Sequence, residues 1–319
     1  MRIPRRALLA ALPLAASAAA AAPAIRISTL RFGSLAWELD VMRRHGLDRG
    51  FALAPLEFAA GPASQVALQA GSVDLVLQDW LWVSRQRASG APWTFAPATA
   101  ALGAVMCPRS SPVRNVADLR GRRLGIAGGP LDKSWLLLRL YATRAQGFDL
   151  DAAVEKTFGP PPLIAEQLAA GRLDAVLTYW PFAARGEAQG LRAVLDMADV
   201  LAALDVPRGM PMLGFVFSGD WAAKNRPALQ AFLDAAQAAR SILASSDAEW
   251  DRIAPLTGAR DAAELEHLRA WYRRGLPGAW DDAARRSAAR LYDLLASIGG
   301  PALVGPATHL APGTFWPSE

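Results

Sequence analysis

Residues 68–74 read LQAGSVD, and residues 168–174 read LAAGRLD. The two stretches share leucine, alanine, glycine and aspartate at the same spacing, and an apolar strand pattern follows each aspartate. Gly71 and Gly171 fit the position just past a helix C-terminus, where a positive φ is favourable only for glycine. Two copies of one helix–glycine–turn–strand unit predict two similar α/β lobes. Chance similarity between two stretches rich in alanine and leucine is the alternative.

The sequence around each copy alternates between strand and helix patterns. The first set has strands at 25–30, 53–58 and 73–77, with helices at 35–45 and 63–70. The pattern restarts near residue 115, with strands at 123–127 and 174–179 and helices at 134–146 and 163–170. Strands that alternate with helices predict parallel βαβ units in a sheet covered on both faces. We therefore expect an α/β protein with two doubly wound lobes.

The chain continues after the second copy with one strand pattern, at 213–218, and then only helical patterns over 221–297. A single strand followed by helices does not complete a third sheet, so we expect it to rejoin the first lobe. The chain then crosses between the lobes twice, near 97–106 and near 205–214. Two crossings form a hinge.

These crossings define the expected domains. The first lobe is discontinuous and comprises residues 25–101 and 213–319, and the second lobe comprises residues 102–212.

The first 24 residues have the three parts of a secretory signal peptide. Three arginines at positions 2, 5 and 6 precede an apolar run over 7–22, and small residues at 20, 22 and 24 offer cleavage sites. A membrane anchor is the alternative, but this alanine-rich run is interrupted by Pro13 and is short for a bilayer about 30 Å thick. We expect residues 1–24 to be removed and the mature protein to be soluble outside the cytoplasm. The general and the twin-arginine export routes both fit Arg5 and Arg6.

The composition argues against several classes of function. The formal charge of +5 includes the three arginines of the first segment, and no basic stripe is interleaved with aromatic residues, so we expect no nucleic-acid partner. The single Cys107 excludes an internal disulfide, and the three histidines lie far apart, so we expect neither a metal site nor a cofactor. No later segment approaches transmembrane length, so we expect no stable membrane insertion.

Five sequence motifs, taken in their order along the chain, resemble those of one protein family. They are FGSLAWEL (32–39), EFAAGPASQVALQAGSVDLVL (57–77), SSPVRNVADLRGRRLGIAGG (110–129), IAEQLAAGRLDAVLTYWPF (164–182) and WAAKNRPALQAFLDA (221–235). Together they resemble the periplasmic solute-binding proteins of the nitrate/sulfonate/taurine ABC transporters, and most of all the aliphatic sulfonate-binding proteins.

This resemblance implies the bilobal fold of type II periplasmic binding proteins and a monomer that works in the periplasm. It also implies capture of a small organic anion or zwitterion and its delivery to an ABC permease and its ATPase. The chain departs from the sulfonate binders at two places. Residues 128–134 replace a serine-rich turn, and residues 179–181 replace Trp-Asp-Pro, so the solute is left open.

Four loops are expected to meet between the lobes, because ligands of doubly wound sheets lie beyond the carboxyl ends of the strands. They are residues 32–37 and 78–82 of the first lobe and residues 128–134 and 178–182 of the second. The candidate ligand-binding residues on these loops are Ser34, Trp37, Asp79, Trp80, Gly129, Lys133, Ser134, Tyr179 and Trp180.

The expected roles follow from the chemistry of each group. Helix N-termini after Gly33 and Gly129, with the hydroxyls of Ser34 and Ser134, offer donors to an anion. Asp79 suits an ammonium or hydroxyl group of the solute, with Lys133 as its counter-charge, and the Trp and Tyr rings provide stacking surface. The alternatives are that Ser34 and Asp79 only cap helices, that Lys133 is solvated and that some of the rings are core residues.

No catalytic residue is expected. An enzyme on the same fold, with Cys107 or a serine as nucleophile, is one alternative, but no histidine lies on a loop between the lobes to activate it. An accessory protein that passes its ligand to another periplasmic protein is the other alternative.

Overall fold

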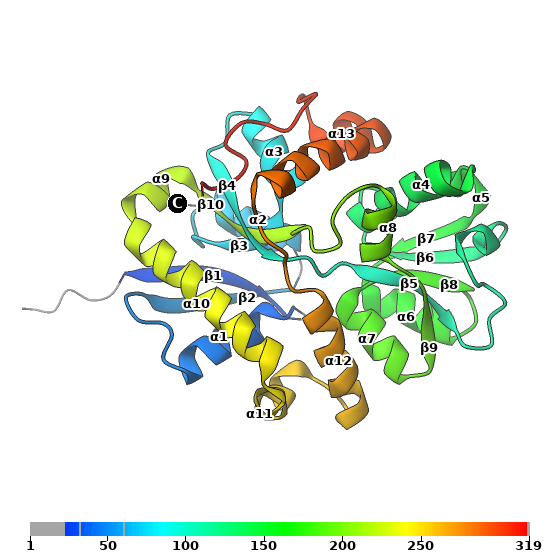
Figure 1. Ribbon diagram of the computed structural model, residues 1–319, viewed down its shortest axis with the longest axis horizontal. Coiled ribbons are helices and arrows are strands. Elements are labelled where there is room, and N and C mark those ends of the chain that lie inside the picture. The colour runs from blue at the N-terminus through cyan, green and yellow to red at the C-terminus, as the bar shows by residue number, and fades with distance from the viewer. Residues whose placement is uncertain (1–22, 32, 60, 318–319) are drawn as a thin grey trace, which may run out of the picture.

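The computed structural model describes residues 23–31, 33–59 and 61–317, and two α/β lobes lie side by side in it (Figure 1). The expected signal peptide, apart from Pro23 and Ala24, lies outside these residues, as does Phe32. In the described part of the chain, no helix is both long and apolar enough to cross a membrane.

The first lobe is built on five strands in the spatial order β2, β1, β3, β10 and β4. Their bounds are β1 (Ala24–Leu30), β2 (Ala52–Phe58), β3 (Val76–Asp79), β4 (Trp93–Thr99) and β10 (Leu213–Ser218). β1 pairs with β2 in parallel and contacts β3 through an isolated bridge between Ile27 and Leu75. β10 lies between β3 and β4 and is antiparallel to both. The strand that follows the second lobe is therefore part of the first sheet.

The second lobe holds five strands in the order β7, β6, β8, β5 and β9. Their bounds are β5 (Gly103–Pro108), β6 (Arg123–Ala127), β7 (Glu155–Gly159), β8 (Ala175–Tyr179) and β9 (Leu191–Asp196). β6 is parallel to β7 and β8, whereas β5 is antiparallel to β8 and β9. The predicted parallel units are present in β1 with β2 and in β6 with β7 and β8. Both sheets are nevertheless mixed, because β5 and β10 carry the chain from one lobe to the other and enter their sheets in the reverse direction.

Thirteen α-helices of the described chain surround the sheets. Their bounds are α1 (Leu35–Arg44), α2 (Gly61–Gln69), α3 (Trp80–Ala88), α4 (Lys133–Gln146), α5 (Leu150–Ala153), α6 (Pro161–Ala169), α7 (Trp180–Ala188), α8 (Met197–Ala203), α9 (Gly219–Lys224), α10 (Arg226–Ser245), α11 (Asp247–Thr257), α12 (Ala262–Arg274) and α13 (Asp282–Val304), with a short 3-10 helix η1 at Val116–Leu119.

The sequence repeat is a structural repeat with an offset of 100 residues (Gly171 against Gly71). α2 and α6 end just before these glycines, and both glycines have φ +69°, as predicted for residues past a helix end. β3 and β8 follow, and then the equivalent helices α3 and α7. Gly90 and Gly190, which follow those helices, both have φ +87°. The two lobes therefore share one supersecondary unit.

The C-terminal helices lie at the junction of the lobes. α12 packs on α7 of the second lobe, and α13 packs on both α3 and α4 (Figure 1). The segment after α12 also joins both crossings of the chain: the Gly275 carbonyl accepts from Ala100 N at 2.9 Å, and Gly278 N donates to the Gly209 carbonyl at 2.9 Å. The connection between the lobes thus involves a third segment besides the two expected crossings.

Candidate functional site

Asp79 and Lys133 meet across the boundary between the lobes. Asp79 ends β3 of the first lobe and caps α3, because its Oδ1 accepts from Trp82 N at 2.8 Å. Lys133 is the first residue of α4 in the second lobe, and its Nζ lies 3.0 Å from Asp79 Oδ2. The Asp79 side chain is only 7% exposed. Two of the four expected loops are therefore joined by a partly buried ion pair.

Asp132 is a third charged group at this junction, and the sequence analysis missed it. Its Oδ1 accepts from Ser134 N at 2.9 Å and caps α4, while its Oδ2 accepts from the Tyr179 hydroxyl at 3.0 Å. Burial raises the pKa of the Asp132 carboxyl, although Lys133 and the donated hydrogen bonds act against this. An aspartate placed directly before a helical pattern is a typical N-cap, which is the signal that identifies it.

The charges at the junction affect one another. Burial lowers the pKa of the Lys133 ammonium, but the carboxylates of Asp79 and Asp132 outweigh this effect, so its net pKa is raised. Burial, together with Asp132, also raises the pKa of the Tyr179 hydroxyl, which therefore remains a hydrogen-bond donor. The junction thus holds two carboxyl groups, one ammonium group and one hydroxyl.

Gly128 permits the close approach of Tyr179 to Asp132. Gly128 has φ +96°, and a Cβ there would lie 2.7 Å from the Tyr179 hydroxyl and 3.0 Å from Asp132 Oδ2. The next residue, Gly129, has no heavy atom within 4 Å of a Cβ built on it. Only the first glycine of the pair is required by packing, and the second borders open space.

The start of α4, where the sequence predicts an anion, already has a carboxylate cap. The Asp132 carboxylate accepts the hydrogen bond from Ser134 N that a bound anion was expected to take, and Asp79 does the same at the start of α3. Ser34 differs, because it caps α1 with no side-chain hydrogen bond to the helix, and it is half-buried. No carboxylate side chain therefore caps α1, and the same holds for α7, whose N-cap is Tyr179.

The expected aromatic wall is also corrected. Trp37, Trp80 and Trp180 are each at most 8% exposed and belong to the hydrophobic core. The indole N–H of Trp37 donates to the Leu256 carbonyl at 3.2 Å, and that of Trp80 donates to the Pro211 carbonyl at 3.1 Å. Tyr179 alone among the four rings keeps a partly exposed side chain. Burial of the large rings outweighs their placement on loops, as expected for residues with so much apolar surface.

The three buried tryptophan rings do not form a single cluster. Trp37 of the first lobe meets Trp180 of the second edge to face, with centroids 5.9 Å apart, and Trp250 of α11 lies 5.8 Å from Trp37. This aromatic cluster connects the two lobes. Trp80 instead contacts Phe315 near the C-terminus, with centroids 6.1 Å apart.

Below the aromatic cluster, Glu38 of α1 is buried, and its Oε1 accepts from the Tyr272 hydroxyl of α12 at 2.9 Å. Burial raises the pKa of Glu38, against the opposing effects of Arg240 and Tyr272. This hydrogen bond attaches α12 to the first lobe.

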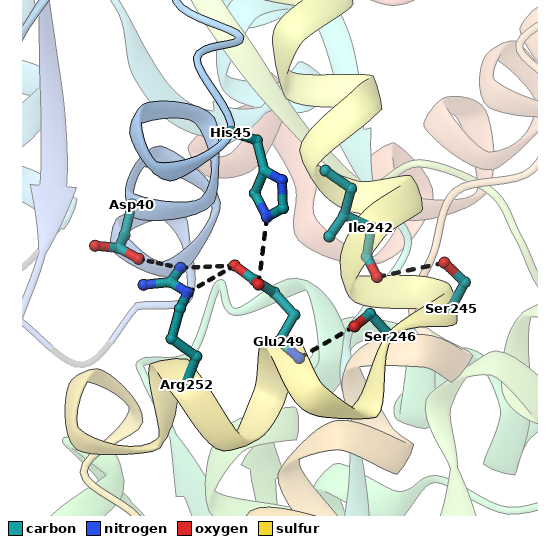
Figure 2. Close-up of polar contacts among 7 residues, drawn as sticks. All are labelled: Asp40, His45, Ile242, Ser245, Ser246, Glu249 and Arg252. Carbon is teal, nitrogen blue, oxygen red and sulfur yellow. Dashed lines mark hydrogen bonds and ion pairs between the residues drawn. The ribbon is translucent and has the colours of Figure 1, made fainter.

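An ionic cluster fixes α1 against α11 (Figure 2). Arg252 of α11 bonds to Asp40 of α1 and, at 2.7 Å, to Glu249 Oε1, while His45 Nε2 lies 3.3 Å from Glu249 Oε2. Burial raises the pKa of Glu249, but its bonds to Arg252 and His45 outweigh this, so the net pKa is lowered. The cluster holds the helix whose N-terminus carries Ser34.

A second set of ion pairs joins α12 to α7 of the second lobe. Arg185 Nε lies 2.9 Å from Oε1 of Glu264, whose side chain is 1% exposed. Glu187 Oε2 accepts from the Trp271 indole at 2.8 Å and lies 3.1 Å from His267 Nδ1. α12 is therefore attached to both lobes.

Neither Cys107 nor the cavity beside α10 adds a group to the candidate site. Cys107 is buried in β5, with its Sγ 3.8 Å from the Val113 carbonyl. Within the ranges the structure describes, no three His, Cys, Asp or Glu side chains form a group able to hold a metal ion. A cavity of about 390 Å³ lies between α10 and residues 276–280, and none of the candidate residues lines it.

The chain is similar in fold to several proteins of known structure. The chain resembles the periplasmic aliphatic sulphonate binding protein SsuA from Escherichia coli, with a TM-score of 0.72 and 20% identity over 92% of this chain and 97% of that one. It also resembles the alkanesulfonate-binding protein SsuA from Xanthomonas axonopodis pv. citri, solved with bound MOPS, with a TM-score of 0.69 and 20% identity over 92% and 98%.

A desulfurization enzyme, DSZB, has a similar fold as well, with a TM-score of 0.55 and 18% identity over 90% of this chain and 97% of that one. No curated protein sequence matches the chain. The sequence model of the NMT1-like family matches residues 114–256. These similarities confirm the fold predicted from the motifs: the chain has the fold of the periplasmic sulfonate-binding proteins, and residues 114–256 are NMT1-like in sequence.

Proposed function

We propose that this protein is the extracytoplasmic solute-binding component of an ABC importer and that it captures a small organic anion or zwitterion between its lobes. The observation that carries the proposal is the meeting of Asp79 and Lys133, because it brings loops of both lobes together at the carboxyl ends of their strands. This is where doubly wound sheets bind ligands. The fold shared with sulfonate-binding proteins supports it.

We assign the solute contacts to Ser34, Asp79, Gly129, Lys133, Ser134 and Tyr179. An acidic group of the solute fits the start of α1 at Ser34, the Lys133 ammonium and the Ser134 hydroxyl, because Asp79 and Asp132 already accept from backbone N–H groups at the starts of α3 and α4. Gly129 borders open space at the start of α4. An amino group of the solute fits Asp79. The partly exposed ring of Tyr179 gives an apolar contact.

The biological setting is part of the proposal. The solute passes to an ABC permease and its ATPase, and the protein acts as a monomer in the periplasm after removal of residues 1–24. It performs no catalysis. The fold of DSZB makes an enzyme the alternative, but Cys107 is buried in β5 and is poorly placed to attack a solute between the lobes.

Native mass spectrometry of freshly purified protein tests the proposal first, because tight binders retain their solute. We expect a mass in excess of the mature chain, and calorimetry with that solute then measures the affinity. Each charge-assisted hydrogen bond is worth about 1.5–3 kcal/mol, so Asp79→Asn and Lys133→Met are expected to weaken binding roughly ten- to a hundredfold.

Asp251→Asn is the matched control, because Asp251 is exposed on α11. If Asp79→Asn, Lys133→Met and also Ser34→Ala, which leaves the Asp79–Lys133 pair intact, all bind like the parent, the assignment of the site is wrong. If the protein retains no solute and no alkanesulfonate or aminoalkanesulfonate shifts its melting temperature, the proposed function is wrong.

A further inference from the structure

We infer that the Asp79–Lys133 ion pair is a latch that holds the two lobes together when no solute is bound. In this role the Lys133 ammonium of the second lobe occupies the position beside the Asp79 carboxylate of the first lobe that an amino group of the solute would take. The inference rests on the proposed function only in assuming that a solute enters between these lobes and must break the pair to do so.

The position of Lys133 is the first reason. It is the first residue of α4, where the positive end of the helix dipole disfavours a cation. A lysine at this place does not stabilise its own helix. The stabilisation comes instead from the carboxylates of Asp79 in the other lobe and Asp132 beside it, and their charges outweigh the effect of burial on the lysine.

The rigidity of Asp79 is the second reason. Its Oδ1 accepts from Trp82 N at 2.8 Å, and its own backbone N donates to Gln78 Oε1 at 2.9 Å. Oδ2 is thereby fixed in the direction of Lys133, and the carboxylate is 7% exposed. An ion pair with one immobile and largely buried partner is screened less by salt than a surface pair.

The ion pair is expected to hold the lobes together only while no solute is bound. Separating the lobes leaves the Asp79 carboxylate and the Lys133 ammonium without each other, so the pair favours the compact state. A solute that binds between them replaces this contact with its own, and the affinity it shows is reduced by the cost of breaking the latch.

Spin labels report the distance between the lobes without any solute. Val66→Cys on α2 of the first lobe and Leu163→Cys on α6 of the second provide label sites, because these residues are 63% and 42% exposed, whereas the native Cys107 is buried. Electron–electron double resonance on this doubly labelled protein is the measurement. Native mass spectrometry confirms that each sample is free of solute.

Three variants are made in the labelled protein. Asp79→Asn removes the charge and keeps the cap on α3, and Lys133→Met removes the charge and keeps an apolar stem. The third variant combines the two substitutions. Lys156→Met is the matched control, because Lys156 pairs at 3.0 Å with Asp151 inside the second lobe. Circular dichroism verifies that every variant is folded.

We expect both single variants to show longer or broader distances than the parent, while Lys156→Met leaves the distribution unchanged. The double variant is expected to be no more open than either single variant, because both remove the same contact. Parent-like distances in Asp79→Asn and Lys133→Met overturn the latch, as does additive opening in the double variant. Neither result bears on solute capture, which the calorimetry above tests separately.

Discussion

Asp174 occupies in the second lobe the place that Asp74 occupies in the first. Each carboxylate accepts a backbone N–H at 2.8 Å, from Arg26 for Asp74 and from Arg123 for Asp174. Each also binds the guanidinium of the same arginine, at 2.6 Å and 2.7 Å respectively. β1 of the first lobe and β6 of the second are thus each tied by one side chain to the turn that follows the repeated helix.

We predict that Asp74→Ala destabilises the protein by about 1–3 kcal/mol, because it leaves a backbone N–H and a guanidinium without their acceptor. Asp174→Ala is expected to cost less, since the Asp174 side chain is 28% exposed against 6% for Asp74. Urea unfolding measures both. The exposed Asp251→Ala is the control, and equal losses at positions 74 and 251 would show that the repeated ion pair is not structural.

Gly128 and Gly129 are predicted to differ when each is replaced by alanine. Gly128→Ala is expected to destabilise the protein by at least about 1–2 kcal/mol, because φ +96° is strained for a residue with a Cβ and because that Cβ meets the Tyr179 hydroxyl. Gly129→Ala is expected to change stability by less than about 0.5 kcal/mol. Thermal unfolding decides between them, and a Gly128→Ala protein as stable as the parent would contradict the described geometry.

The buried carboxylate of Glu264 is predicted to be needed for stability. Glu264→Gln is expected to cost about 3 kcal/mol, because it leaves Arg185, whose pKa burial already lowers, without its charged partner. Glu266→Gln, on the exposed face of the same helix, is the control and is expected to be near neutral. Similar midpoints for both variants in denaturant would refute the attachment of α12 to the second lobe.

The pH dependence of stability is predicted to change in Asp132→Asn. Burial raises the pKa of Asp132 above its unfolded value of about 4, so the folded protein holds this proton more tightly than the unfolded chain. The contribution of Asp132 is fully present below the unfolded pKa and is lost as pH rises through the folded pKa. The unfolding free energy of the parent minus that of the variant is therefore expected to fall as pH rises above about 4.

Unfolding in urea at a series of pH values from 3 to 7 checks this sign. Asparagine retains the N-cap of α4 through its one amide oxygen, while its NH2 group replaces the oxygen that accepts from the Tyr179 hydroxyl. The loss of that hydrogen bond is the same at every pH, so the slope of the difference against pH reports the charge. A difference that stays flat or rises with pH would mean that Asp132 is better stabilised as a carboxylate than its burial indicates.

Local sequence patterns predicted the fold well, because the effects of glycine on turn conformation and of aspartate on helix capping depend on neighbouring backbone atoms. Gly71 and Gly171 have the positive φ that their position requires, and the strand at 213–218 returns to the first sheet. The direction of β5 and β10 did not follow from local pattern, since strand direction is set by the path of the chain between lobes. The contacts of residues 259–280 with both lobes could not be predicted either, because their partners are distant in sequence.

The candidate site was predicted in part for the same reason. Asp79 pairs with Lys133, and Tyr179 bonds to the neighbouring Asp132, so loops from the strand ends of both lobes come together as the order of elements implies. The burial of Trp37 and Trp80 depends on α11, α12 and the C-terminal residues, and no spacing within their loops reports these partners. The position of Asp132 between Ser134 and Tyr179 likewise requires the second sheet to be formed.

The attachment of α12 to both lobes gives the molecule a mechanical linkage besides its hinge strands. Arg185 of the second lobe holds α12 through Glu264, while Tyr272 joins the same helix to Glu38 of the first lobe. Just beyond α12, Gly275 is bonded to the first crossing and Gly278 to the second. A rotation between the lobes would therefore have to shift α12 or break one of these bonds, so a helix outside both sheets limits how far the lobes can turn.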